Sequence, residues 1–229
     1  MTQTRWLGAS LVLYAFAFNA PYVWLAANFD YPAILRRPAG EILHAFAAGG
    51  TPLVLAWAAF MLAALALAPL ALALARLTGH GAGVTALGIA AALAQAIGLS
   101  RWTFVAPGLA AAWRSDAAAR TTVEATFATL HQFAGVGIGE TIGQVFTAFW
   151  LIGVAAAQAR TRRALAALAA LAAVLLLAGQ AEGLATAIAF NPGPLVWSAP
   201  LGFLAVTAWL IATGCAAFAA DAPKAETPT

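Results

Sequence analysis

Long apolar runs without charge alternate with short polar segments along this chain. A helix needs about 20 mostly apolar residues to cross a bilayer, and six runs have roughly that length or more. They are residues 7–28, 52–75, 82–100, 135–157, 164–190 and 195–219. The fourth and the fifth contain one acidic residue each, and the others contain no charge. The pattern therefore predicts one transmembrane domain of six helices over 1–220, followed by a polar C-terminal tail at 221–229.

The amino-acid composition agrees with this pattern and excludes other classes of protein. Only 8% of the 229 residues are charged, 63% are hydrophobic, and the mean hydropathy is +0.88. Soluble domains carry about 25% charged residues, because a surface that faces water needs a polar shell. The chain is therefore neither a soluble enzyme nor a disordered protein, and its single cysteine excludes a disulfide scaffold. We predict an all-α integral membrane protein that is embedded in the lipid bilayer.

The positions of the basic residues predict the orientation in the membrane. The net charge is +3, but the basic residues are scattered between apolar runs, so nucleic acid is not expected as a partner. Six spans place both termini on one side, and a short loop on that side contains the cluster Arg160, Arg162 and Arg163. Because short loops rich in Lys and Arg stay in the cytoplasm, we expect both termini to be cytoplasmic.

Two similar phrases precede the second and the fourth runs. Residues 43–49 read Leu-His-Ala-Phe-Ala-Ala-Gly, and residues 130–135 read Leu-His-Gln-Phe-Ala-Gly. An internal repeat would give each half a short interfacial helix at the outer face, which ends at glycine before the next span. The first of these helices would lie within 38–50. His44 and His131 would then be equivalent, unless the similarity arises by chance in a chain rich in alanine and leucine.

Polar and ionisable side chains within the runs gather in the halves that face the outer side. Such groups are costly in hydrocarbon and usually face the bundle interior or a wet cavity. We therefore predict one polar cavity that opens to the outer side; the alternative is that each group only bonds a neighbouring helix. The candidate ligand-binding residues are Glu140, Gln144, Glu182, Gln180, Gln95, Arg101, His131 and His44.

The fourth run contains the densest part of this pattern. Glu140 and Gln144 are four residues apart and share one face of a helix. Beside them, Gly135, Gly139 and Gly143 form a stripe of small residues, which predicts close approach of another helix.

The relation between His131 and Glu140 depends on the helix between them. They are nine residues apart, which is about half a turn out of phase on an α-helix. On that geometry they could act as a pair only if the glycines at 135, 137 and 139 break the helix. Trp102, like other tryptophans near span ends, is expected in an aromatic belt at the membrane interface.

Three classes of function remain open, because the sequence contains no complete catalytic, metal, haem or nucleotide motif. No catalytic residue and no cofactor can therefore be assigned. The first class binds or transports a small or lipid-like molecule through the outer cavity. The second is a membrane enzyme that uses Glu140 or Glu182 as acid or base, with His131 as partner. The third is a non-catalytic accessory subunit of a larger complex, and a homo-oligomer would also suit a chain of this size.

Three phrases in the connecting segments are distinctive. They are Asn28-Phe29-Asp30-Tyr31-Pro32 with Leu35-Arg36, Arg101-Trp102 with Pro107-Gly108-Leu109-Ala110, and His131-Gln132-Phe133-Ala134-Gly135. Together they resemble a group of uncharacterised bacterial inner-membrane proteins. The resemblance implies a small six-helix protein of the bacterial inner membrane, and it implies no activity.

Overall fold

The computed structural model describes residues 2–188, 191 and 193–220, and this part of the chain is helical with short connections. It contains six helices that are long and apolar enough to cross a membrane, which confirms the predicted all-α class. These six are Gln3–Phe29, Ala39–Thr78, Ala82–Ser115, Arg120–Gln158, Arg163–Ala185 and Gly193–Ala220. The last residues of the fifth predicted run, 189–190, and the predicted tail at 221–229 lie outside the described residues.

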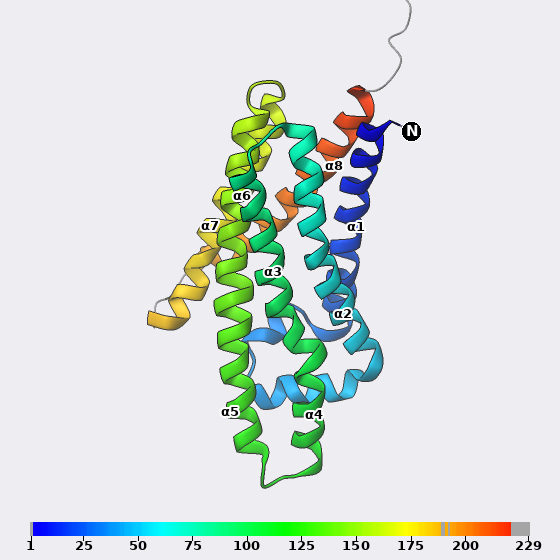
Figure 1. The fold of residues 1–229 in the computed structure, drawn as a ribbon. Helices are drawn as coiled ribbons and strands as arrows, with labels where there is room; N and C mark the ends of the chain where they lie inside the picture. The colour runs from blue at the N-terminus through cyan, green and yellow to red at the C-terminus, as the bar shows by residue number, and fades with distance from the viewer. Residues whose placement is uncertain (1, 189–190, 192, 221–229) are drawn as a thin grey trace, which may run out of the picture.

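Several spans are composed of more than one helical element (Figure 1). The elements in chain order are α1 (Gln3–Phe29), η1 (Ala33–Arg36), α2 (Ala39–Thr78), α3 (Ala82–Phe104), α4 (Ala106–Ser115), α5 (Arg120–Leu130), η2 (His131–Ile142), α6 (Gly143–Gln158), α7 (Arg163–Ile188), η3 (Gly193–Trp197) and α8 (Ser198–Ala220). η1 and η3 are short 3-10 helices, and η2 is a π-helix.

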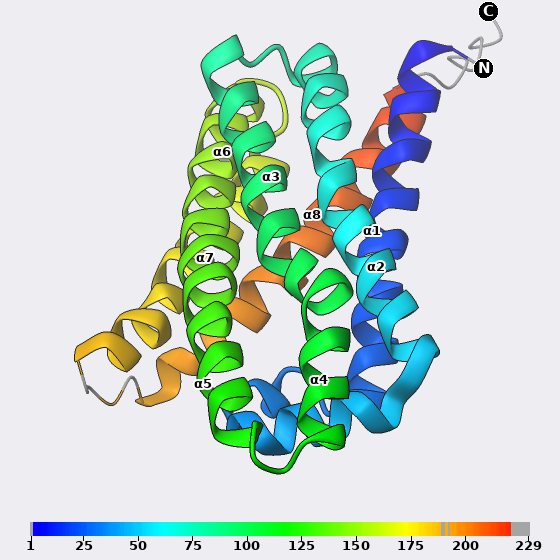
Figure 2. The same ribbon diagram turned by 60° about the horizontal axis from the view of Figure 1, so that its bottom comes forward.

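The helices run up and down, so the bundle has two distinct ends (Figures 1 and 2). The terminal end contains the start of α1, the end of α8 and the α2–α3 and α6–α7 loops. The distal end contains η1, the start of α2, the α4–α5 turn and η3. α1 and α8 meet closely at the terminal end: a Cβ added at Gly8 would lie 2.8 Å from the carbonyl oxygen of Gly214. Both ends of the described chain therefore lie on one side, as six spans require.

The core that separates the two ends is built from alanine, leucine and tryptophan. Trp150 of α6 and Trp209 of α8 are fully buried and pack edge to face, with ring centroids 5.7 Å apart. The Trp209 Nε1 group donates to Gln158 Oε1 at 3.0 Å, and Gln158 Nε2 donates to Thr213 Oγ1 at 3.5 Å. These bonds satisfy the buried polar atoms of Trp209 and Gln158, which would otherwise be costly to bury. The Nε1 group of Trp150 is buried without a partner among the described residues. Side chains thus fill the bundle on this side, and the large cavity described below lies toward the distal end.

α2 contains the break that the sequence predicted at the two adjacent glycines. Gly50 has φ 56° and ψ −152°, a conformation open to glycine but not to other residues without strain. Residues 39–49 therefore form a short helix that changes direction before the span, and it crosses the distal end in Figure 2. Pro38 directly precedes this helix, where its missing N–H costs no hydrogen bond. The first predicted short helix is confirmed, and it lies at the distal end.

The second predicted short helix is present as α5, but no break separates it from its span. α5, η2 and α6 form one continuous helical segment, Arg120–Gln158. The glycines that were expected to end the short helix lie inside η2, where the chain changes from α to π winding. α4 and α5 instead form a helical hairpin at the distal end, joined by a turn near Asp116.

The prediction that His44 and His131 are equivalent is therefore wrong. His44 lies before the Gly50 break on the exposed side of its short helix, with its ring 5.9 Å from that of Trp113. His131 is half-buried at the start of η2. The two segments are similar in sequence, but the first lies in an α-helix that is kinked at Gly50 and the second lies at the start of a π-helix.

Candidate functional site

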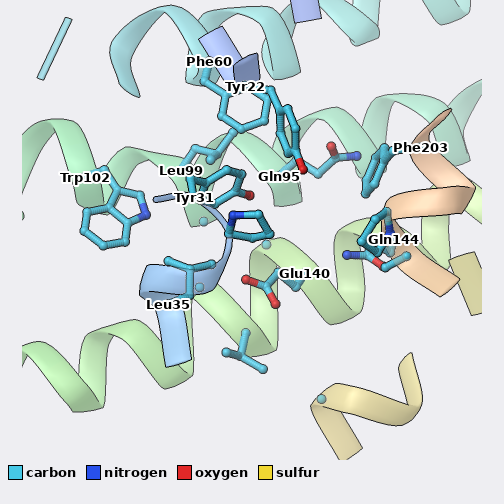
Figure 3. Close-up of a pocket in the computed structure, with 18 of the residues that line it drawn as sticks. Tyr22, Tyr31, Leu35, Phe60, Gln95, Leu99, Trp102, Glu140, Gln144 and Phe203 are labelled. Carbon is cyan, nitrogen blue, oxygen red and sulfur yellow. The ribbon is translucent and has the colours of Figure 1, made fainter. Parts of the chain in front are cut away.

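A cavity of about 650 Å³ lies in the distal half of the bundle. This volume falls within the range of pockets that hold small organic ligands, roughly 300–1,000 Å³. Its walls come from α1, the η1 segment, α2, α3, η2, α6, α7, η3 and α8. Figure 3 shows the Glu140 carboxylate directed into this space, with Trp102 toward one end of it and Phe203 toward the other.

Six of the eight predicted residues line this one cavity. They are Glu140, Gln144, Glu182, Gln95, Arg101 and His131. Gln180 does not line the cavity itself, but its Nε2 donates to Oε1 of the lining residue Gln144 at 2.8 Å. His44 is not among the lining residues. Glu140 and Glu182 therefore share a cavity, as the sequence pattern predicted for residues in the same half of the membrane.

Glycine packing between α3 and η2 sets the position of the polar wall. A Cβ at Gly98 would lie 2.5 Å from the Cα of Gly139, so the two backbones are in direct contact. One turn away on either side, Gly135 packs against the Arg101 guanidinium and Gly143 against Gln95. The predicted glycine stripe is thus the surface on which α3 lies.

Arg101 is held within the wall by its neighbours. Arg101 is only 7% exposed, and its Nη1 donates to the carbonyl oxygen of Gly98. Its Nη2 lies 3.5 Å from Nδ1 of His131, and the guanidinium carbon lies 5.1 Å from the ring centroid of Trp102. Its Nε is buried and has no partner among the described residues. The positive charge is therefore fixed in place and largely enclosed by protein.

The π winding of η2 brings His131 and Glu140 to the same cavity. In a π-helix each N–H bonds the carbonyl five residues earlier, so two turns cover about nine residues. Residues nine apart, which would lie on opposite faces of an α-helix, then lie on one face. His131 and Glu140 therefore line one cavity although no break separates them, because the helix changes type instead.

Glu140 differs from the other charged groups of the cavity in its contacts. Its carboxylate makes no hydrogen bond to any described residue and no ion pair within 4.0 Å in that part of the chain. The charged groups that act on it electrostatically are Arg101, Glu182 and Arg36. Its acceptor atoms therefore face the cavity.

Arg36 and Glu182 form an ion pair at the rim. Arg36 Nε donates to Glu182 Oε1 at 2.7 Å, and Arg36 Nη2 contacts the same oxygen. The two side chains are 52% and 32% exposed. This pair links the η1 segment to α7 where the cavity approaches the distal surface.

The amide side chains of the cavity are oriented by bonds to neighbouring helices. Gln95 Nε2 donates to Thr147 Oγ1 at 3.0 Å, and Thr147 in turn donates to the Gly143 carbonyl at 2.7 Å. Asn19 Nδ2 donates to Ala15 O at 2.7 Å and to Thr207 Oγ1 at 3.0 Å. In both amides the nitrogen is engaged in the bundle and the oxygen is left for the cavity.

An aromatic wall faces the polar one, and the sequence did not reveal it. Trp57 and Trp102 are fully buried and stack at 4.7 Å with an interplanar angle of 10°. Tyr31 packs edge-on against Trp57 at 5.3 Å and against Phe60 at 6.2 Å. The expectation of Trp102 in an interfacial belt is therefore wrong. Trp57, in the middle of a span, was the one sign of this wall in the sequence. No hydropathy pattern indicates that Tyr31, a residue of a connecting segment, folds back into the bundle.

Tyr31 adds a proton donor to this wall. It lies in the α1–η1 connection, outside the spans. Burial raises the pKa of its hydroxyl well above the ordinary value, and the nearby Glu140 charge raises it further, whereas Arg101 lowers it. The hydroxyl therefore stays protonated at neutral pH and can donate a hydrogen bond in the cavity.

The described residues contain no group of three or more His, Cys, Asp or Glu side chains that could hold a metal ion. The chemistry available in the cavity is therefore that of one enclosed guanidinium, one carboxylate without a hydrogen-bond partner in the described chain, an imidazole, oriented amides and phenolic hydroxyls.

Comparison with known proteins identifies a family. No curated protein and no solved structure matches the chain. One family model matches residues 6–214, and its description is "Domain of unknown function (DUF4386)". The match reaches into all six spans and includes every residue that lines the cavity. This multi-pass membrane protein therefore belongs to the DUF4386 family.

Proposed function

We propose that this protein binds a small amphipathic, lipid-like molecule in its distal cavity. The observation that carries the proposal is the pairing of two unlike walls around a single space of about 650 Å³. One wall is polar and contains Glu140, Gln144 and Arg101; the other is aromatic and contains Trp57 and Phe60. A molecule with an apolar body and a polar head satisfies both walls at once.

The position of the cavity favours access from one side of the membrane. The Arg36–Glu182 pair at its rim is partly exposed at the distal surface, whereas the Trp150–Trp209 core lies on the terminal side. We place the distal end on the outer side of a bacterial inner membrane and both termini in the cytoplasm. The cluster of Arg160, Arg162 and Arg163 in the α6–α7 loop supports this orientation.

The proposal is tested by identifying what copurifies with the protein in a mild detergent. Mass spectrometry of the purified wild type should detect a bound amphipathic molecule at a stoichiometric level. The variant Leu99→Trp, which fills the cavity from α3, should lose it. Leu93→Trp on the same helix is the matched control, because Leu93 is 49% exposed on the outside of the bundle. Retention of the molecule by Leu99→Trp would contradict the proposal.

A membrane enzyme is the second candidate, and one observation favours it. His131 and Glu140 both line the cavity, as an acid–base pair would require. The same copurification experiment separates the two functions: an enzyme converts the bound molecule to a product on incubation, and a binding protein releases it unchanged. A stoichiometric protein partner with no small molecule would instead favour an accessory subunit.

A further inference from the structure

The charged groups around the cavity already balance one another. Arg36 and Glu182 are paired at the rim, and Arg101 and Glu140 carry opposite charges within the walls. His131 presents Nδ1 to the Arg101 guanidinium at 3.5 Å, so a second positive charge on the imidazole would face a cation there. A charged ligand would leave a net charge in a site that is poorly solvated, which is costly.

Several donors of the enclosed Arg101 are already engaged or buried, which limits the hydrogen bonds that it can offer to an anionic head group. Its Nη1 is bonded to the Gly98 carbonyl, its Nη2 faces His131, and its Nε is buried. A phosphate or carboxylate needs free, converging donors from such a cation. It would also approach Glu140, which carries the same sign of charge.

Several acceptors in the cavity are left free by the protein. They include the carboxylate oxygens of Glu140, Oε1 of Gln95 and Oδ1 of Asn19, none of which accepts a bond from a described residue. The free donors include the hydroxyls of Tyr22 and Tyr31 and the Nε2 group of Gln144, whose Oε1 is engaged by Gln180. The matching head group therefore donates several hydrogen bonds and accepts a few.

From these three observations we propose that the molecule bound in the cavity is a nonionic amphiphile with a hydroxyl-bearing head, such as a monoacylglycerol. A hydroxyl both donates and accepts, so it can pair with Glu140 and with a tyrosine in the same pose. An ammonium head could donate to Glu140, but it has no acceptor for the tyrosines and adds a charge to a balanced site. This inference rests on the proposed function and specifies its ligand class.

The inference is tested by binding of three probes with the same alkyl chain and different heads. The probes are monolauroylglycerol, dodecylamine and dodecyl phosphate, added to the protein in lipid nanodiscs, with empty nanodiscs as the blank. We expect the monoacylglycerol to bind about tenfold or more tightly than either charged probe. Leu99→Trp should abolish this binding and Leu93→Trp should not, which separates cavity binding from partition into the lipid.

A second set of variants tests the role of Glu140. Glu140→Leu removes the acceptors and should weaken monoacylglycerol binding by about tenfold or more, because it leaves head-group donors unpaired. Glu140→Gln keeps an acceptor oxygen and should weaken it less. Glu41→Gln, which changes an exposed carboxylate of the short distal helix, should leave binding unchanged.

The outcomes separate the two proposals. Tighter binding of dodecylamine, lost in Glu140→Gln, would overturn the nonionic head group and leave the binding function intact. Tighter binding of dodecyl phosphate would overturn it in the same way. If no probe binds above the blank and nothing copurifies with the wild type, the proposed function itself fails.

Discussion

His131 and Glu140 line the same cavity although they are nine residues apart on one unbroken helical segment. The π-helix His131–Ile142 is the cause, because its wider turns return to the same face after about nine residues. π-Helices are rare in proteins, and those that occur are often found at functional sites. The glycines within this stretch let α3 lie directly against it, and that contact places Arg101 beside His131.

The shared orientation of these two residues is testable by a double-mutant cycle. The changes are His131→Ala and Glu140→Gln, separately and together, with monolauroylglycerol binding as the measurement. Because both side chains line one cavity, we expect a coupling of about 0.5 kcal/mol or more between them. Strictly additive effects would indicate that they face different surroundings.

The glycine contact between α3 and η2 predicts a large loss of stability from a small change. Gly98→Ala would bring a Cβ within 2.5 Å of the Gly139 Cα, and neither backbone can move without separating the helices. We expect a loss of about 1–3 kcal/mol in unfolding free energy, measured as a lower melting temperature in detergent. Gly108→Ala in α4 is the control, since a Cβ there meets nothing within 4 Å. Equal melting temperatures for the two variants would contradict the packing.

The rim ion pair predicts an effect on rates more than on stability. Arg36 and Glu182 are partly exposed, so Arg36→Gln should cost less than about 1 kcal/mol of stability. The same change unlinks the η1 segment from α7 and should speed the dissociation of monolauroylglycerol, measured after dilution from a preloaded sample. The charge-swapped double variant Arg36→Glu with Glu182→Arg should slow dissociation again. An unchanged dissociation rate in Arg36→Gln would show that the rim does not control release.

The proposed orientation predicts which loop is reached from outside the cell. In a Cys215→Ala background, Ser115→Cys at the distal end should react with a membrane-impermeant thiol reagent in intact cells. Thr161→Cys in the loop of the arginine cluster should resist it until the cells are opened. The reverse pattern would place the cavity on the cytoplasmic side.

Hydropathy predicted much of the fold because transmembrane helices bury their backbone bonds internally and must be apolar throughout. The six spans and the Gly50 break follow from local composition and glycine chemistry. The shared cavity of Glu140 and Glu182 also followed, because polar groups in one half of a bundle avoid lipid by turning inward.

The helix type of η2 and the aromatic wall could not be predicted from the sequence. No local pattern in residues 131–142 specifies a π-helix, and its close contact with Gly98 of α3 is a tertiary feature. Trp102 follows Arg101 near the end of a span, a position typical of interfacial anchors. Its burial depends on stacking with Trp57, which is 45 residues earlier in the chain.

The most direct test of ligand binding in the distal cavity is photocrosslinking with a monoacylglycerol that carries a diazirine on its alkyl chain. After irradiation in nanodiscs, peptide mapping should place the label on cavity residues of α2, η2 and α8, such as Phe60, Val136 and Phe203. Excess unlabelled monoacylglycerol and the Leu99→Trp variant should each remove this labelling. Labelling confined to outward-facing residues such as Leu13 and Leu72, unaffected by competitor, would contradict the account.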